Sequence, residues 1–285
     1  MTPPFEGALT LARAALPSIP VVNQLPGIRK TGGEFTGLSR SGAPVTVERG
    51  HVDAYAAVCG FPTKDTVPLP YPHLLAFELQ MGIMSDPAFP APAIGTVHLE
   101  NSITAHRAIA IGETLGVTAS VGPAKPHPKG MTYDFLTVIT ADGENVWEET
   151  STYLRRGKGD PSASSGSVFP EAEPHGIVWR LPADLGRRYA AVSGDHNPIH
   201  LYPLTARELG FPRQIAHGMW TMARCVAALE NRLPDAVRID VAFKKPVLLP
   251  GSVAFGSTPV DGGFAFGLTS PKDGAPHLAG RTTAL

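Results

Sequence analysis

The sequence is poor in cysteine, in long apolar runs and in excess charge of either sign. Its 285 residues include two cysteines, Cys59 and Cys225, which form no zinc or redox motif and exclude a disulfide framework. Each is expected to be a buried free thiol. No apolar run approaches the roughly 18 residues of a membrane-spanning helix, and no basic segment opens a secretory signal. These absences favour the cytosol.

The charges are balanced, with 24 basic and 25 acidic residues and a formal net charge of −1. The chain has no long basic run, so nucleic acid is not expected as its main partner. Glycine and proline, in contrast, are abundant, with 30 and 29 residues. Such frequent interruption predicts short strands and many turns rather than a helical bundle or a coiled coil.

One segment of unusual composition divides the chain. Residues 157–176 are rich in glycine, serine and proline and have no apolar period, which is typical of a linker. It separates a first unit, residues 1–156, from a second unit, residues 177–285. Residues 55–61 and 189–195 are identical at five of seven positions, at a constant offset of 134 residues. This match and the similar order of elements indicate an internal duplication.

Both units show the same predicted elements. Residues 74–85 and 218–231 are helical and apolar on most sides, so both helices are expected to be buried. Strand-like segments rich in β-branched and aromatic residues follow each helix, with short turns between them. They cover residues 93–103, 114–121, 132–141, 144–155, 237–246, 252–259, 263–270 and 277–283. Each unit is therefore predicted to be an α+β arrangement in which a curved antiparallel sheet wraps a central helix.

The residues that carry chemistry lie at positions 189–200, Tyr-Ala-Ala-Val-Ser-Gly-Asp-His-Asn-Pro-Ile-His. A helix is expected to end at Gly194, because glycine suits a helix C-terminus. The Asn-Pro pair that follows favours an extended or turn conformation. Asp195 and His200 are therefore predicted to lie on one irregular loop. There a carboxylate and an imidazole can hold a water molecule between a hydrogen-bond acceptor and a base.

Gly218 is the first residue of the second buried helix. The N–H groups that begin a helix have no partner within it and carry partial positive charge. A glycine lets a ligand approach that backbone closely, which is what a developing oxyanion needs. The loop and the helix end together fit the addition of water next to a carbonyl group.

These segments resemble the MaoC-like, (R)-specific enoyl-CoA hydratases, or hydratase-2 family. The similarity rests on Tyr, then Ser-Gly-Asp-x-Asn-Pro-Ile-His and Ala206, and on Gly-Phe-Pro-x-x-Ile-Ala-His-Gly-Met at residues 210–219. With Pro-Leu-Pro-Tyr-Pro-His at 68–73 and Glu-Asn-Ser-Ile-Thr at 100–104, the whole chain is similar to the long actinobacterial 3-hydroxyacyl-thioester dehydratases. That resemblance implies a double hot-dog fold: two sheets, each around a central helix, joined into one pseudo-dimeric unit.

The resemblance also implies roles for individual residues. Asp195 and His200 match the catalytic pair, Asn197 matches a loop-shaping asparagine, and Gly218 matches the backbone donor to the thioester oxygen. The implied activity is that of a hydro-lyase of fatty-acid metabolism, which interconverts trans-2-enoyl and (R)-3-hydroxyacyl thioesters without a cofactor. The substrate would be carried by CoA or by an acyl carrier protein.

The first unit departs from this pattern. At the offset of 134 residues, Phe61 stands in the place of Asp195 and Thr66 in the place of His200. The chain is therefore expected to have one active site. Its first unit would shape an acyl tunnel around residues 71–84, although core packing explains the same residues equally well.

Simpler interpretations stay open for several residues. His196 and His200 stand four apart, as metal ligands on a helix do, but the Asn-Pro pair is expected to break a helix, so no metal is predicted. His217 either lines the site or only shapes the helix start. Three basic residues either meet the phosphates of the carrier or are simply solvated: Arg213, Lys244 and Lys245.

Two other functions compete with hydration. A hot-dog thioesterase would direct water to C1 of the thioester instead of C3. A non-catalytic subunit that binds acyl thioesters is the second alternative, and the intact pair of Asp195 and His200 argues against it. The sequence also allows two pseudo-dimeric chains to pair as a homodimer.

Overall fold

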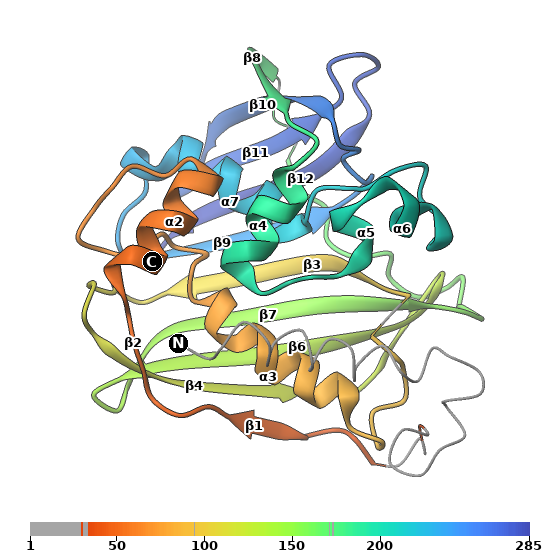
Figure 1. Cartoon of the computed structure of the whole chain (residues 1–285), viewed down its shortest axis with the longest axis horizontal. Helices are drawn as coiled ribbons and strands as arrows, with labels where there is room; N and C mark the ends of the chain where they lie inside the picture. The colour runs from red at the N-terminus through yellow and green to blue at the C-terminus, as the bar shows by residue number, and fades with distance from the viewer. Residues whose placement is uncertain (1–29, 31–33, 94, 171, 173) are drawn as a thin grey trace.

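The computed structural model describes residues 30, 34–93, 95–170, 172 and 174–285 (Figure 1). The strands of the first unit are β1 (Ser39–Ser41), β2 (Val45–Thr46), β3 (Thr96–Ala105), β4 (Thr114–Val121), β5 (Lys125–His127), β6 (Gly130–Ala141) and β7 (Glu144–Arg156). Those of the second unit are β8 (Pro174–Leu181), β9 (Val237–Phe243), β10 (Gly251–Val260), β11 (Gly263–Thr269) and β12 (Pro276–Ala284).

The described helices are α2 (Arg49–Cys59), α3 (His73–Ser85), α4 (Leu185–Ser193), α5 (Pro198–Leu201), α6 (Pro203–Glu208) and α7 (Gly218–Leu229), followed by the short 3₁₀ helix η3 (Glu230–Arg232). Helix α3 lies across β4 and β6, and α7 lies against β11 (Figure 1). Both helices bury apolar residues on most of their surface, as predicted. No helix in the described part of the chain is both long and apolar enough to cross a membrane.

The two predicted sheets are joined into one. The strand order is β1-β4-β6-β7-β3-β9-β12-β11-β10-β8, with β2 beside β4 and β5 beside β6. The junction is the antiparallel pairing of β3 with β9, where Ile103 lies opposite Ile239. The pairing of β3 with β9 therefore leaves no exposed strand edge between the two units.

The duplicated segment forms the same structure twice. It makes the C-terminal turns of α2 and α4, which pack against each other, and each helix ends in a left-handed glycine, Gly60 at φ 83° and Gly194 at φ 74°. The rings of Tyr55 and Tyr189 lie 6.2 Å apart between these helices. Glycine is required at both ends because side chains rarely tolerate this backbone conformation.

All eight predicted strands and both predicted central helices are confirmed within a few residues. The sequence pattern does not predict β1, β2, β5 and β8 or the helices α2, α5 and α6. Strand β8 begins at Pro174, inside the segment predicted as a linker, while residues 157–170 and 172 contain no helix or strand. The division into units 1–156 and 177–285 stays a prediction. Cys59 and Cys225 are buried free thiols, as predicted.

Candidate active site

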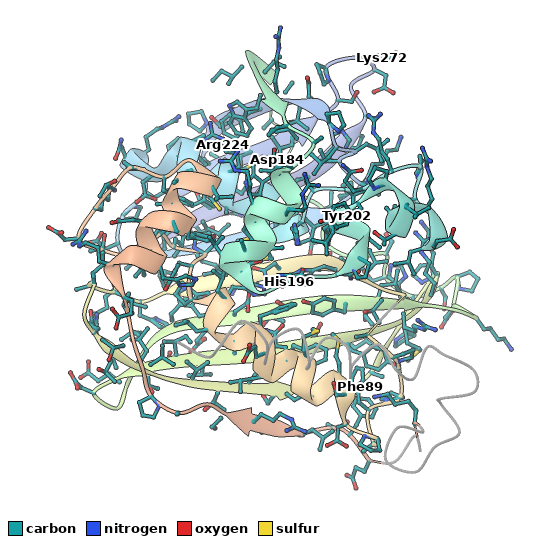
Figure 2. The ribbon with its side chains drawn as sticks, viewed as in Figure 1. Phe89, Asp184, His196, Tyr202, Arg224 and Lys272 are labelled. Atoms are coloured by element: carbon teal, nitrogen blue, oxygen red, sulfur yellow. The ribbon has the colours of Figure 1, made fainter. Side chains whose placement is uncertain are left out.

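Asp195 lies on the short loop between α4 and α5, next to His196, which is labelled in Figure 2. Two local hydrogen bonds shape this loop. The Asp195 N–H donates to Ser193 Oγ at 3.2 Å, and Asp195 Oδ1 accepts from the Asn197 N–H at 3.0 Å. Ser193 therefore has a structural contact at this loop, and Asn197 fixes one carboxylate oxygen of Asp195.

The prediction that His200 shares an irregular loop with Asp195 is wrong. His200 lies in α5, a single helical turn that ends just before Tyr202, the next labelled residue in Figure 2. Pro198 is in the first turn, where its missing N–H breaks no hydrogen bond and its fixed φ suits a helix. The Asn197 side chain caps the turn by accepting from the Ile199 N–H at 3.3 Å. The Asn-Pro pair thus begins a helix here.

His200 is held in one tautomer. Its ring is 7% exposed, and Nδ1 lies 2.8 Å from the carbonyl oxygen of Ile215. Since a carbonyl only accepts, Nδ1 carries the proton and Nε2 of the neutral ring keeps a free lone pair. Burial lowers the pKa of His200 below its ordinary value, against the opposing effect of Asp195. His200 is therefore a neutral base near physiological pH.

His217 fixes the backbone of the same loop. Its Nε2 donates to the carbonyl oxygen of Asp195 at 3.0 Å and lies 3.8 Å from Asp195 Oδ2. The rings of His217 and His200 stack with centroids 3.7 Å apart. Burial lowers the pKa of His217 to about 3, so its ring is neutral. Its contacts place His217 at the site, in addition to shaping the start of α7.

The structure brings Asp195, His200 and His217 together, with one polar atom of each within 4.8 Å of the others. The Asp195 side chain is 23% exposed, so that water or a substrate can reach it. Burial opposes ionisation of this carboxyl, but His217, His200 and the Asn197 N–H together lower its pKa. An ionised carboxylate therefore lies next to a neutral imidazole. Together the two groups can orient and deprotonate a water molecule.

Gly218 follows His217 directly, so the first amide of α7 belongs to the residue next to one of the three site residues. The orphan N–H groups and the positive end of this helix are available to a developing negative charge. A β-carbon at position 218 would lie 3.3 Å from the Phe243 ring, closer than ordinary contact. Glycine therefore lets the Phe243 ring pack against the start of α7.

Comparison with known proteins identifies the family. Residues 172–262 match the family described as MaoC like domain. The chain is 36% identical over 291 residues to the 3-hydroxyacyl-thioester dehydratase X of Mycobacterium tuberculosis, and the match covers 100% of both chains. The chain belongs to the MaoC-like dehydratase family.

Solved structures confirm the double hot-dog fold of this MaoC-like chain. The crystal structure of HtdX from Mycobacterium tuberculosis matches with a TM-score of 0.78 at 36% identity, covering 87% of this chain and 100% of that chain. Another Mycobacterium tuberculosis protein, described as having a double hot-dog fold, matches with a TM-score of 0.53 at 15% identity, covering 89% and 98%. The latter likeness concerns the fold alone.

The three site side chains of the MaoC-like chain include residue types that bind metals, one carboxylate and two imidazoles. Two imidazoles that share a metal ion must direct their in-plane lone pairs at one point about 2 Å from each nitrogen. The rings of His200 and His217 are stacked instead, with 27° between their planes. Their in-plane lone pairs therefore lie in two nearly parallel planes and do not meet at one ion. The geometry therefore favours acid–base chemistry over metal binding.

The basic residues predicted to meet carrier phosphates lie on the surface. Arg213, Lys244 and Lys245 are all exposed. Arg213 donates to the carbonyl oxygen of Pro250 at 2.9 Å, and Lys244 Nζ lies 3.5 Å from the carbonyl oxygen of Ser167. These contacts do not involve the three site side chains, and the binding of phosphates by these residues stays a prediction.

The corresponding positions of the first unit hold no acid–base pair. The buried Phe61 ring stacks on Tyr55 at 6.2 Å, and Thr66 forms an isolated β-bridge with Ala110. A packed phenyl ring and a backbone bridge thus occupy the places of the carboxylate and the imidazole.

Two further residues support the site and are not predicted from the sequence. A β-carbon at Gly186, inside α4, would lie 1.9 Å from the carbonyl oxygen of His200, so this glycine lets α4 and α5 pack in contact. His51 of α2 bonds to the carbonyl oxygen of Val192 at the end of α4. A glycine within an otherwise helical segment is a signal for the first, whereas nothing local in the sequence indicates the second.

Proposed function

We propose that this chain catalyses the reversible hydration of trans-2-enoyl thioesters to (R)-3-hydroxyacyl thioesters. The observation that carries the proposal is the meeting of the Asp195 carboxylate with the neutral His200 imidazole, next to the first amide of α7. The family provides independent support, since its relative from Mycobacterium tuberculosis is named a 3-hydroxyacyl-thioester dehydratase.

In the hydration direction, Asp195 and His200 Nε2 bind a water molecule and accept a proton as its oxygen forms a bond to C3. The electron pair of the C2–C3 double bond moves toward C2 and the thioester oxygen, where the Gly218 N–H donates a hydrogen bond. A proton then returns to C2. One water is added across one double bond, so no oxidant, reductant or other co-reactant is consumed. Dehydration is the reverse.

The rate enhancements expected from these groups are adequate for such a reaction. A positioned acid or base contributes about 100- to 10,000-fold in rate, and one backbone donor to an oxyanion contributes about 100- to 1,000-fold. Both groups come from the second unit, while Phe61 and Thr66 in the first unit offer neither. We therefore assign one active site to the chain.

We propose that the first unit binds the acyl group of the substrate. Phe243, which lies against Gly218, ends strand β9, and β9 pairs with β3 of the first unit. An acyl chain that leaves the thioester at Gly218 and passes Phe243 therefore meets side chains that β3, β7 and α3 contribute.

We further place the reaction in the cytosol, with CoA or an acyl carrier protein as the carrier, and propose that two chains pair. Support for pairing comes from the edge strand β8, where Ile177 and Val178 are 47% and 48% exposed. Within the described ranges β8 ends the sheet, and apolar side chains on such an edge favour association with a second sheet. Light scattering at several concentrations measures the mass of the assembly.

The test of the activity is incubation with crotonyl-CoA. Loss of enone absorbance without release of free thiol, and formation of the (R)-3-hydroxy product on a chiral column, is the expected result. Release of free thiol would identify a thioesterase instead. Binding without either change would identify a non-catalytic subunit.

A further inference from the structure

A second buried polar cluster lies in the first unit, between α3 and the sheet. The Glu149 carboxylate on β7 is at its centre: Oε1 accepts from His73 Nδ1 and from Asn101 Nδ2, both at 2.7 Å, and Oε2 accepts from Gln80 Nε2 at 3.3 Å. Each of these four residues is at most 4% exposed. None of them takes part in the mechanism above.

The cluster contains three buried atoms that find no hydrogen-bond partner among the residues that the structure describes, namely Gln80 Oε1, Asn101 Oδ1 and His98 Nε2. The amide nitrogens are already used, since Gln80 Nε2 also bonds to Thr137 and Asn101 Nδ2 also bonds to Ser151. Gln80 Oε1 and Asn101 Oδ1 are amide oxygens, which can only accept hydrogen bonds.

His98 adds a third acceptor. Burial lowers the pKa of His98 to about 3, so the ring is neutral, and its hydrogen bond to the backbone of Glu100 leaves Nε2 with a lone pair. A buried acceptor without a donor is costly, and a protein rarely keeps several of them in one place. Three together call for a hydrogen-bond donor that enters the cluster from outside.

A row of aromatic rings lies between Gly218 and the cluster. Phe243, which lies against Gly218, has its ring centroid 4.9 Å from that of His98. The His98 ring lies 6.4 Å from that of His73, which bonds to Glu149. The charge of Asp195 also acts on His98. Phe243 and His98 therefore lie between Gly218 and the cluster, on the course that the proposed acyl chain takes from the thioester.

We propose that this cluster binds a hydroxyl group on the distal part of the substrate's acyl chain, and so selects hydroxylated enoyl thioesters. This inference rests on the proposed function. A hydroxyl donates a hydrogen bond to one of the orphan oxygens. A plain alkyl chain of equal length would leave all three acceptors without a donor. A cationic group is disfavoured because three N–H donors already compensate Glu149. An anionic group would be repelled by that same carboxylate.

The test compares substrates of equal chain length. The kcat/KM values of hexenoyl-, octenoyl- and decenoyl-CoA are measured beside those of their ω-hydroxy counterparts. We expect the hydroxylated substrate to be favoured by about tenfold at the length that reaches the cluster, because one satisfied acceptor is worth about that factor. In Gln80→Met and Asn101→Leu the ratio should fall to about one. The exposed Asn231→Leu is the matched control and should keep the wild-type ratio.

Binding provides a second measurement that does not depend on turnover. Calorimetry with the saturated ω-hydroxyacyl-CoA and acyl-CoA gives their Kd ratio for the wild type and for Gln80→Met. Equal kcat/KM values for both substrate series, or a hydroxyl preference that survives in a folded Gln80→Met protein, would overturn the proposal and assign the orphan acceptors to water. Absence of turnover with a retained Kd ratio would reject the proposed reaction but support the hydroxyl site.

Discussion

His51 Nε2 donates a hydrogen bond to the backbone carbonyl of Val192 at 2.8 Å, and this bond joins α2 of the first unit to the end of α4 in the second. The other ring nitrogen, Nδ1, accepts from the Tyr71 hydroxyl at 2.7 Å. Val192 stands three residues before Asp195. The first unit, which lacks the proposed catalytic groups, therefore holds the helix that precedes Asp195.

Replacing His51 by alanine should weaken both stability and activity. The carbonyl of Val192 loses its donor, so we expect the free energy of unfolding to fall by about 1–2 kcal/mol. The loop of Asp195 gains freedom, so kcat should fall several-fold. Urea denaturation and initial rates measure the two effects. Tyr71→Phe is the control, because it keeps the bond to Val192. An equal loss of kcat in Tyr71→Phe would show that this bond does not position the loop.

The catalytic pair makes a second prediction. Asp195→Asn keeps the size of the side chain and an oxygen that accepts from the Asn197 N–H, but it removes the charge. His200→Ala removes the base. We expect each variant to lose about 100- to 10,000-fold in kcat with crotonyl-CoA, while circular dichroism reports a folded protein. Near-native turnover in Asp195→Asn would contradict the mechanism.

The pH dependence of kcat/KM follows from the same two groups. Activity requires His200 neutral and Asp195 ionised, and the pKa of each is lowered from its ordinary value. Protonation of His200 therefore begins below about pH 6.5, the ordinary value for histidine. We expect kcat/KM to be flat through neutral pH and to decline only on the acid side of that value. An acid limb centred above pH 7 would contradict the lowered pKa of His200.

The free energy of unfolding must be measured at each pH as a control, because it is expected to fall on the acid side just as kcat/KM does. A histidine that is neutral when folded binds its proton more readily when unfolded, so stability is lost as pH falls below the unfolded pKa of about 6.5. Burial lowers the pKa of His217 and of His98 to about 3, so both contribute along with His200. Tryptophan fluorescence separates this unfolding from the titration of the site.

The sequence predicts the parts of this protein that depend on local patterns. The eight predicted strands have β-branched and aromatic residues between recognisable turns, whereas β1, β2 and β5 have at most three residues and too little pattern to identify. Strand β8 has eight residues but begins inside the segment whose composition predicts a linker. Helix α5 was missed because Pro198 was treated as a breaker rather than as a first-turn residue. The motif does identify Asp195, His200 and Gly218 as candidates.

Long-range contacts set the limit of such prediction. The bond from His51 to Val192 joins residues 141 positions apart, and that from His73 to Glu149 joins residues 76 apart. No local pattern indicates either pair. The role of His217 was left open for the same reason, since only its contacts with Asp195 and His200 distinguish site lining from helix packing.

Gly186 provides a test of how closely α4 and α5 must pack. In Gly186→Ala the added methyl group would collide with the carbonyl oxygen of His200, at 1.9 Å, and backbone atoms cannot yield as a side chain does. We expect α5 to shift, kcat to fall at least about tenfold, and Tm to decrease. Gly50→Ala in α2 is the matched control, since its methyl group meets nothing within 4 Å. Unchanged kcat in Gly186→Ala would show that the position of His200 is not critical.

Removal of metal ions should leave the activity unchanged. Asp195, His200 and His217 have the residue types of a zinc site, but each imidazole already donates a proton to a backbone carbonyl, and their stacked planes lie only 27° apart. A shared ion would need both remaining lone pairs to converge at about 2 Å, which requires one ring to turn and to give up its carbonyl. We therefore expect kcat/KM to be the same before and after dialysis against EDTA, with less than stoichiometric metal by elemental analysis. Loss of activity that added zinc restores would instead make these three side chains metal ligands, and the water would then be activated by the ion rather than by His200.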